Sequence, residues 1–406
     1  MLATELKRIY LLILLISLLF CGHVNAQDAR INESNEHYLE PEIMMGKIVP
    51  IRSHFPSSPF ISSFSLSFAK INYSTDNNWS KYYNYPSVGL SFAATNLGNN
   101  QVFGNEFTAM TFIQFKWSRY KTNCSYFKCS IGASYFTRQY GPNDPTNFMI
   151  GSPFTWAFQL NGYRYLYHSK NIHLKVGLGY LHNSNGHIQL PNLGLNSATA
   201  SISAQLFTDN TKPHLHYPED ANTIDHTLHY FIQSKNGIGL QELGGKTGPA
   251  GTPKKGVYTF SMAGGVVFNQ HIKVRMGLAY RYYKQYHDYI IKTNDSTYIA
   301  HPDWNASNVF VHVGCEFLIT HFSIDIEEGI NLYKPFYKTF YKRFESGPSI
   351  DYTLKSLITG HLALNYYLFN MAKNPKNNIF IGANINANMG QADFSEISFG
   401  FVHNIK

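Results

Sequence analysis

The residue types that could do chemistry gather in one segment, residues 181–196, which reads LHNSNGHIQLPNLGLN. An alternating stretch comes before it, and His182 and Ser184 continue the parity of its apolar face, formed by Ile172, Leu174, Val176, Leu178 and Tyr180. On an extended strand, residues two apart project from the same face, roughly 7 Å from each other. The imidazole and the hydroxyl can therefore lean toward one another.

A third polar residue shares this parity on the following stretch. After the turn at Pro191 and Asn192, Asn196 precedes an apolar face made of Ala198, Ala200, Ile202, Ala204 and Leu206. If the two stretches form a hairpin, all three polar side chains face the apolar side near one membrane interface. Polar groups directed at hydrocarbon are costly unless they are interfacial or functional. Two interpretations stay open, a catalytic group or a polar strand end beside an Asn- and Gly-rich turn.

The elements that must position these residues are strands. Period-2 alternation in segments of about ten residues is typical of a transmembrane β-barrel and continues through the chain. We expect strands at 60–72, 86–95, 105–117, 125–137, 154–166, 171–184, 196–207, 227–238, 256–268, 271–284, 307–319, 321–333, 359–369, 377–388 and 393–403. The expected fold is an all-β, antiparallel transmembrane β-barrel. The polar face of the later strands could line a pore or plug it, with Lys273, Arg275, Arg281, His312 and Glu316.

One barrel should account for the whole exported chain, residues 27–406. Because single-chain bacterial barrels use even strand numbers, we expect 12 or 14 strands, with at least one of these segments outside the barrel. Residues 27–55 precede the first clear strand and are placed in the periplasm. Residues 208–255, with Gly244-Gly245 and several prolines, read as a long loop rather than as a linker between domains.

Composition agrees with a barrel and excludes other classes. Aromatic residues make up 16% of the chain and charged residues 14%, whereas a soluble domain carries about 25% charged residues. No interior window is apolar enough for a membrane helix, which needs about 18 continuous apolar residues, so a helical membrane protein is excluded. Tyrosines at strand ends, Tyr280, Tyr282, Tyr283, Tyr286 and Tyr289, fit an interfacial belt. A soluble exported sandwich that binds glycans remains an alternative.

The N-terminus predicts export. Lys7 and Arg8 precede an apolar run over residues 9–20, and Val24-Asn25-Ala26 offers a small-residue cleavage site, so residues 1–26 read as a signal peptide. Three cysteines follow it, Cys124, Cys129 and Cys315; the first two could pair across a bend or stay free. An odd count excludes a complete disulfide framework.

Other chemistries find little support. The net charge of +8 comes without a dense basic run, so we expect no nucleic-acid partner. We expect no metal and no cofactor either. His214, His216, His226 and His229 are dense around the long loop, but no fixed third ligand accompanies them. His187 reads as a solvated turn residue.

The 181–196 segment resembles the lipid A 3-O-deacylase (PagL) family of outer-membrane acyl hydrolases, in a longer form. The matching pattern is His182-x-Ser184-Asn185-Gly186 followed by Pro191-Asn192-x-Gly194-x-Asn196. Upstream, residues 85–92, YPSVGLSF, and Gly98-Asn99 are similar to the early strands of the family. The similarity extends over about residues 85–208, and the later strands look only generically like a barrel.

The resemblance implies an outer-membrane esterase that removes an acyl chain from lipid A, the lipid anchor of lipopolysaccharide, in the cell outer membrane. It makes Ser184 the nucleophile and His182 the general base, with Asn185, Gly186 and Asn192 as candidate oxyanion or substrate-positioning donors. The family usually has a glutamate where this chain has Asn196. An amide can orient the histidine ring but cannot stabilise an imidazolium by charge. The alternative is therefore a non-catalytic outer-membrane barrel, such as a channel, a structural protein or an inactive family member.

Overall fold

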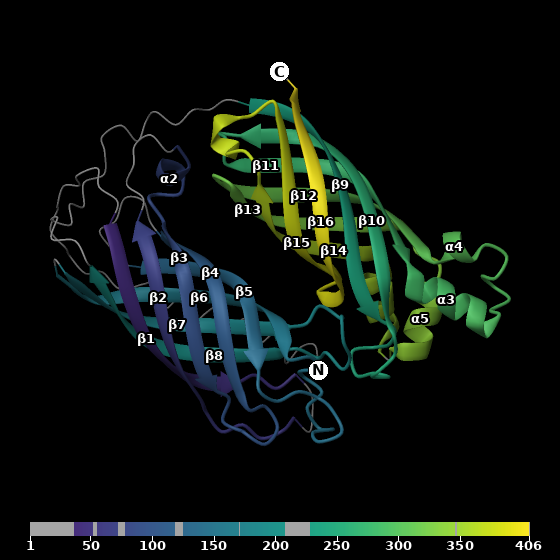
Figure 1. The fold of residues 1–406 in the computed structure, drawn as a ribbon, viewed down its shortest axis with the longest axis horizontal. Coiled ribbons are helices and arrows are strands. Elements are labelled where there is room, and N and C mark those ends of the chain that lie inside the picture. Colours follow the sequence, from purple (N-terminus) through teal and green to yellow (C-terminus); the bar gives the residue numbers. More distant parts are fainter. Residues whose placement is uncertain are drawn as a thin grey trace. The chain divides into compact units, whose positions relative to one another are not determined.

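The chain forms two closed antiparallel β-barrels in the computed structural model (Figure 1). The structure describes residues 36–51, 55–71, 78–117, 125–169, 171–207, 228–345 and 347–405. Within these ranges sixteen strands fall into two sets of eight. The chain divides into two compact units, each of which contains one barrel.

The first barrel runs in chain order from β1 to β8 and closes where β1 pairs with β8, for example Ile43 opposite Ile202. Its strands are β1 Glu36–Ile48, β2 Ile61–Ile71, β3 Ser87–Asn96, β4 Asn105–Lys116, β5 Ser125–Phe136, β6 Phe154–His168, β7 Ile172–Ser184 and β8 Leu195–Phe207, with a short helix α2 Asn78–Tyr82 before β3. Closure leaves no unpaired strand edge in this barrel.

The second barrel closes where β16 pairs with β9, for example Ile397 opposite Ile238. Its strands are β9 Leu228–Glu242, β10 Lys254–Phe268, β11 Ile272–Tyr283, β12 Ser307–Ile319, β13 Phe322–Tyr333, β14 Ile358–Tyr367, β15 Asn377–Asn388 and β16 Gln391–Ile405. Helices lie in its connections: α3 Lys284–Thr293, α4 Pro302–Asn305, α5 Tyr337–Phe344, α6 Ser349–Leu357 and the 3-10 turn η2 Met371–Lys373.

The prediction of one barrel with 12 or 14 strands is wrong. All fifteen expected segments are strands, and a sixteenth, β1, lies in the stretch that was assigned to the periplasm. β1 is difficult to recognise in the sequence because it contains two acidic residues, Glu40 and Glu42. Both side chains point into the barrel, where they are buried. The stretch 208–255 is also not one loop, since it contains β9 and the boundary between the two compact units.

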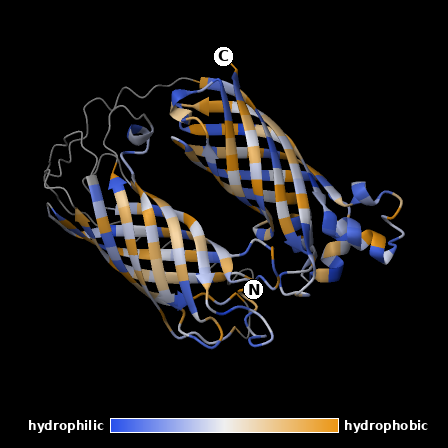
Figure 2. Cartoon of the chain, viewed as in Figure 1, coloured by the Kyte–Doolittle hydropathy of each residue, from blue (hydrophilic) through white to orange (hydrophobic). Residues whose placement is uncertain are grey.

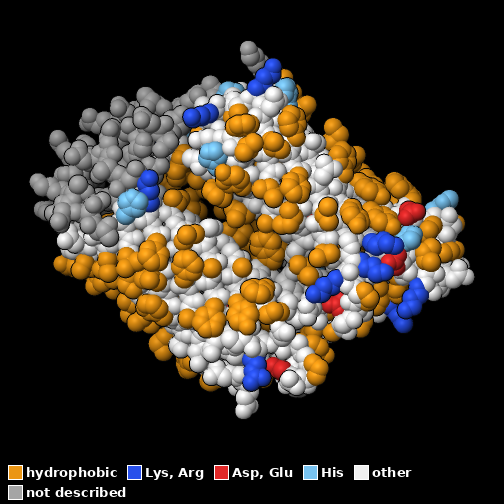
Figure 3. Space-filling view, viewed as in Figure 1, with side chains coloured by type: hydrophobic (Ala, Val, Ile, Leu, Met, Phe, Trp, Pro, Cys, Tyr) orange, Lys and Arg blue, Asp and Glu red, His pale blue; other side chains and the backbone are white. Residues whose placement is uncertain are grey.

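Alternation in the sequence becomes an apolar outside and a polar inside in each barrel. Hydropathy switches from residue to residue along the strands (Figure 2), and large apolar side chains spread over the visible strand surface (Figure 3). Ile43 of β1 is 63% exposed, whereas its neighbour Glu42 is 3% exposed. A wall of this kind is suited to contact with hydrocarbon chains, because apolar groups there avoid water.

Paired charges fill the interior of each barrel. In the first, Lys175 Nζ lies 2.8 Å from Glu40 Oε1. In the second, Arg275 contacts Asp325 at 2.8 Å and Glu327 at 2.7 Å. These side chains are at most 5% exposed. Buried charges persist only where they are paired and hydrogen-bonded.

The lumen residues predicted in the second barrel belong to this filling. Lys273 pairs with Glu316 at 3.0 Å, Arg281 donates to Thr359 and Asn386, and His312 lies 3.1 Å from Glu327. The sequence left open whether these side chains line a pore or plug the barrel. Because they are buried and paired with other side chains inside the barrel, they fill its interior.

Two of the five tyrosines expected in an interfacial belt have a different role. Tyr283 and Tyr286 are buried, and their rings stack at a centroid distance of 4.6 Å. They join Phe336 and Phe340 in an aromatic cluster between the strand ends and helices α3 and α5. Tyr286 lies in α3, beyond the end of β11, and packs inward from that helix. Helices therefore cover one end of the second barrel with an aromatic core.

Several predictions fall outside the described residues. The signal peptide, Cys124 and the histidines 214, 216 and 226 are among them. His229 lies in β9, and Cys129 and Cys315 carry free thiols. Among the described helices, none is long and apolar enough to cross a membrane.

Candidate active site

His182 is set by the register of the hairpin formed by β7 and β8. In this pairing His182 lies directly opposite Asn196. The preceding outward-facing positions Ile172 and Leu174 are exposed, whereas Lys175 and Asn183 are fully buried inside the barrel. Asn183 Nδ2 donates to Glu106 Oε1 at 2.9 Å, which anchors the strand from the inside. A one-residue slip would reverse every face, so this anchor keeps His182 on the outer face.

The imidazole of His182 has one oriented nitrogen. Its Nδ1 lies 2.6 Å from Asn196 Oδ1. An amide oxygen only accepts, so the proton of the neutral ring resides on Nδ1 and Nε2 carries the lone pair. The Phe158 ring stacks on the imidazole at a centroid distance of 6.5 Å. Nε2 is thus the nitrogen that can act as a base.

Ser184 ends β7 two residues later, on the same strand parity, and is 6% exposed. Its Oγ accepts hydrogen bonds from the Gly186 amide at 3.2 Å and from Asn192 Nδ2 at 2.9 Å. Neither of these bonds uses the proton of the hydroxyl. The hydroxyl can therefore still donate its proton to a base.

The turn after Ser184 is held by its own side chains. Asn192 Oδ1 accepts from the Asn185 amide at 3.2 Å, while Asn185 Nδ2 donates to the Gln189 carbonyl at 2.6 Å. Gly186 has φ +64°, and a Cβ there would lie 2.0 Å from Ser395 Oγ. Glycine is required at this position both by its backbone conformation and by the lack of space.

The structure separates the six predicted site residues into two groups. His182 and Asn196 contact each other, and Ser184 contacts Gly186 and Asn192. The side chain of Asn185 donates within the turn instead, so the oxyanion donors closest to Ser184 are Gly186 and Asn192. The catalytic roles themselves stay predictions.

The interpretation of His187 as a solvated residue is wrong. It is 3% exposed, and its Nε2 lies 3.0 Å from the Gly244 carbonyl oxygen. Burial lowers the pKa of this imidazole, because the charged form loses its hydration, although the Gly244 carbonyl opposes the shift. His187 is a structural part of the turn.

Sequence reasoning missed Glu242. The compact unit that contains the second barrel also includes residues 148–152 and 184–193. Within it, Glu242 Oε2 accepts from the Leu190 amide at 2.6 Å. A signal was present, because Glu242 continues the outward, mostly apolar parity of residues 228–240, as His182 continues that of its own strand. No group of three or more potential metal ligands occurs among the described residues.

The family match lies within the first barrel. Residues 68–205 match the family model for Lipid A 3-O-deacylase (PagL). This match confirms the resemblance noted in the sequence. It covers β3 to β7 completely, includes His182, Ser184 and Asn196, and spans about a third of the chain. With the barrel fold, it assigns the protein to the outer membrane.

Other comparisons add less. No curated protein matches the chain. Among solved structures, the chain is similar to the outer membrane protein opdK from Pseudomonas aeruginosa, with 10% identity, a TM-score of 0.21 and coverage of 92% of this chain and 100% of that one. It is also similar to Omp33 from Acinetobacter baumannii, with 8% identity, a TM-score of 0.15 and coverage of 91% and 99%. These TM-scores are too low to inform the function.

Proposed function

We propose that the protein is an outer-membrane esterase that hydrolyses an acyl ester of lipid A by a Ser–His mechanism at the outer wall of the first barrel. The orientation of His182 carries the proposal. Its Nδ1 contacts Asn196 at 2.6 Å, which leaves Nε2 as the base on the strand face that it shares with Ser184. The family match over residues 68–205 supports the choice of substrate.

The chemistry divides into two steps. His182 Nε2 takes the proton of Ser184 while Oγ attacks the ester carbonyl, and the alkoxide leaving group then receives that proton as the acyl-enzyme forms. Water, deprotonated by the same nitrogen, then attacks the acyl carbonyl, and as the fatty acid is released Ser184 Oγ takes the proton back from His182. The Gly186 amide and Asn192 Nδ2, which now donate to Ser184 Oγ, are close enough to stabilise the oxyanion.

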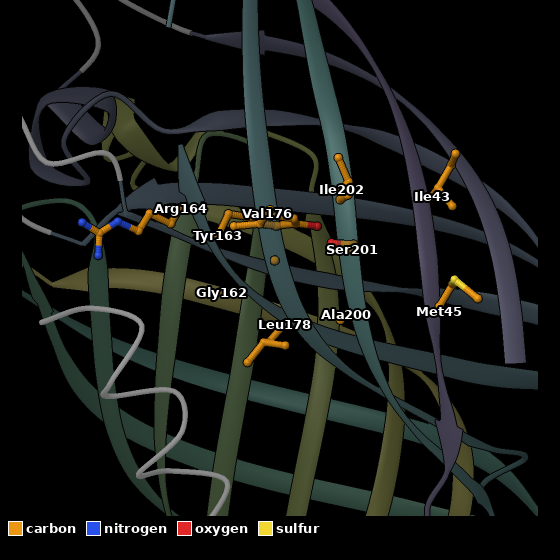
Figure 4. A pocket seen from close by; sticks show the side chains of 11 residues that line it. Ile43, Met45, Gly162, Tyr163, Arg164, Val176, Leu178, Ala200, Ser201 and Ile202 are labelled. Atoms are coloured by element: carbon orange, nitrogen blue, oxygen red, sulfur yellow. The ribbon is translucent and has the colours of Figure 1, made fainter. Parts of the chain in front are cut away.

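The surface beside the site fits an acyl chain. A groove of about 550 Å³ lies on the outer wall of the first barrel, and Figure 4 shows its lining side chains on the neighbouring strands. Val176 and Leu178 of β7 face it, four to six residues before His182 on the same parity. Small residues, Gly162 and Ala200, make room between larger apolar ones. A hydrocarbon chain in this groove would replace contacts that membrane lipids otherwise make.

Burial of Ser184 sets a condition on this mechanism. At 6% exposure the hydroxyl is nearly enclosed, whereas His182 is half-buried. The ester must therefore enter from the side of the imidazole, with a small displacement of the side chains around Oγ.

The test is release of fatty acid from purified lipopolysaccharide by the full-length protein in detergent, followed by mass spectrometry. Wild type should release one class of fatty acid, and S184A and H182A should not. S234A is the matched control, because Ser234 lies on the outward face of β9 and takes no part in the site. Equal release by all four proteins, or none by any, would refute the proposal and favour a non-catalytic barrel, the alternative that Asn196 supports.

A further inference from the structure

The outer face of β9, which is mostly apolar, ends in a carboxylate. Leu228, Tyr230, Ile232, Ile238 and Leu240 are 46–61% exposed along this face. Glu242 follows on the same parity, yet it is 1% exposed. Burial of an unpaired carboxylate is costly, so its partners indicate why it is there.

The partners of Glu242 are hydrogen-bond donors of backbone and hydroxyl groups. Oε2 accepts from the Leu190 amide at 2.6 Å, and Oε1 accepts from the Thr252 amide at 2.7 Å. Thr252 Oγ1 lies 3.4 Å from Oε1 and 3.1 Å from the Leu243 carbonyl oxygen, and its one proton is shared between these acceptors. Bonds from N–H groups to an ionised acceptor are stronger than neutral ones, so the carboxylate fixes Leu190 firmly.

The backbone around Glu242 continues the contact along the turn. The Glu242 amide donates to the His187 carbonyl at 3.2 Å, and the Asn192 amide donates to the Lys246 carbonyl at 2.8 Å. Leu190 thus lies in the middle of a segment whose two flanks are also hydrogen-bonded to residues 242–246. The end of this segment is Asn192, whose side chain donates to Ser184 Oγ.

We propose that Glu242 is a positioning residue for the deacylation reaction, because it holds the turn 185–193 so that Asn192 and Gly186 point at Ser184. This inference rests on the proposed function. Glu242 lies in the second barrel, outside the part of the chain that matches the family. Ser184 and the turn 185–193 belong to the same compact unit as Glu242.

The chemistry of the site makes such support useful. Oxyanion donors act through their fixed direction, and a displacement of about 1 Å can lower a rate about 100-fold. Gly186 and the residues after it form an irregular segment between strands, so barrel pairing does not fix them. A carboxylate that accepts a hydrogen bond from the middle of the segment restricts it.

The experiment compares wild type, E242A, E242Q and D288N as full-length proteins in detergent. Asp288 is the matched control, because this acid of helix α3 forms its ion pairs with Lys255 and Lys284. Hydrogen exchange of the peptide covering residues 184–193 reports whether the turn is held. Fatty-acid release from lipopolysaccharide gives kcat and KM.

We expect E242A to exchange faster in this peptide and to lose about 10- to 100-fold in kcat, with KM within about twofold of wild type. E242Q keeps one acceptor for the Leu190 amide and should recover part of both effects, while D288N should match wild type. Barrel folding is checked for each variant by heat-modifiable gel migration.

Unchanged exchange in E242A would overturn the inference, whatever the activity. Faster exchange with wild-type kcat, or with a higher kcat, would also overturn it, because the reaction would then not need the held turn. If wild type releases no fatty acid, the proposed function fails, and exchange alone decides whether Glu242 holds the turn.

Discussion

Replacing Asn196 by aspartate should accelerate the proposed reaction. Asparagine and aspartate have nearly the same shape, so the acceptor oxygen 2.6 Å from His182 Nδ1 stays in place while a negative charge is added. The charge matters only when the ring is protonated, which occurs as Ser184 attacks. N196D therefore stabilises the transition state more than the resting enzyme.

The size of the gain follows from the kind of hydrogen bond. In Ser–His–Asp hydrolases an Asn in place of the acid lowers kcat about 10⁴-fold, largely because the wrong tautomer is selected. Here Asn196 already presents its oxygen to Nδ1, so the tautomer is correct and only the charge is missing. A bond to a charged group contributes about 1–1.5 kcal/mol more than a neutral bond. That difference corresponds to about a 5- to 13-fold increase in kcat.

The assay is kcat for fatty-acid release from lipopolysaccharide by wild type, N196D, N196A and the matched control N236D. Asn236 lies on the exposed face of β9, so N236D adds the same charge to the outer wall of the second barrel. N196A, which removes the acceptor, should lower kcat about tenfold. A rate for N196D equal to or below that of wild type, in a barrel with normal gel migration, would refute the role given to Asn196.

Three further outcomes follow from the structure. G186A should destabilise the turn by about 1–3 kcal/mol, because φ at Gly186 is +64° and the added Cβ would lie 2.0 Å from Ser395 Oγ. Hydrogen exchange of residues 184–193 should therefore be faster in G186A than in wild type, and G186A/S395G should partly reverse this increase. R275M should lower the free energy of unfolding by about 3–5 kcal/mol in urea titrations, because it leaves buried carboxylates without their cation. The free energy of unfolding should rise from pH 7 to about pH 10, and this rise should disappear in K334M. Burial lowers the pKa of Lys334 to about 7, so the unfolded chain binds more protons than the folded protein in that pH range.

Strand periodicity in the sequence predicts most of the fold. Every expected strand exists because alternation follows directly from a wall with one apolar and one polar side. The number of barrels could not be predicted, because closure depends on which distant strands pair. β1 must return to β8 and β16 to β9, and no local pattern encodes those partners.

The candidate site, like the fold, can be predicted only in part from the sequence. The facing of His182 and Asn196 is a local consequence of hairpin register, so parity predicts it. The contacts of Ser184 with Gly186 and Asn192 depend on the irregular path of the turn, which has no periodicity. Glu242 is about sixty residues further along the chain. Only its parity within β9 hinted that it had a buried partner, and the partner itself required the structure.

Detection of an acyl group on Ser184 would be the most direct evidence for the proposed mechanism. Wild-type protein would be mixed with lipopolysaccharide, quenched in acid within the first turnovers, digested and examined by mass spectrometry. The peptide that contains residues 182–196 should carry one fatty-acyl group at Ser184, and the same peptide from S184A should carry none. Fatty-acid release without an adduct at Ser184, together with full activity of S184A, would contradict the Ser–His mechanism.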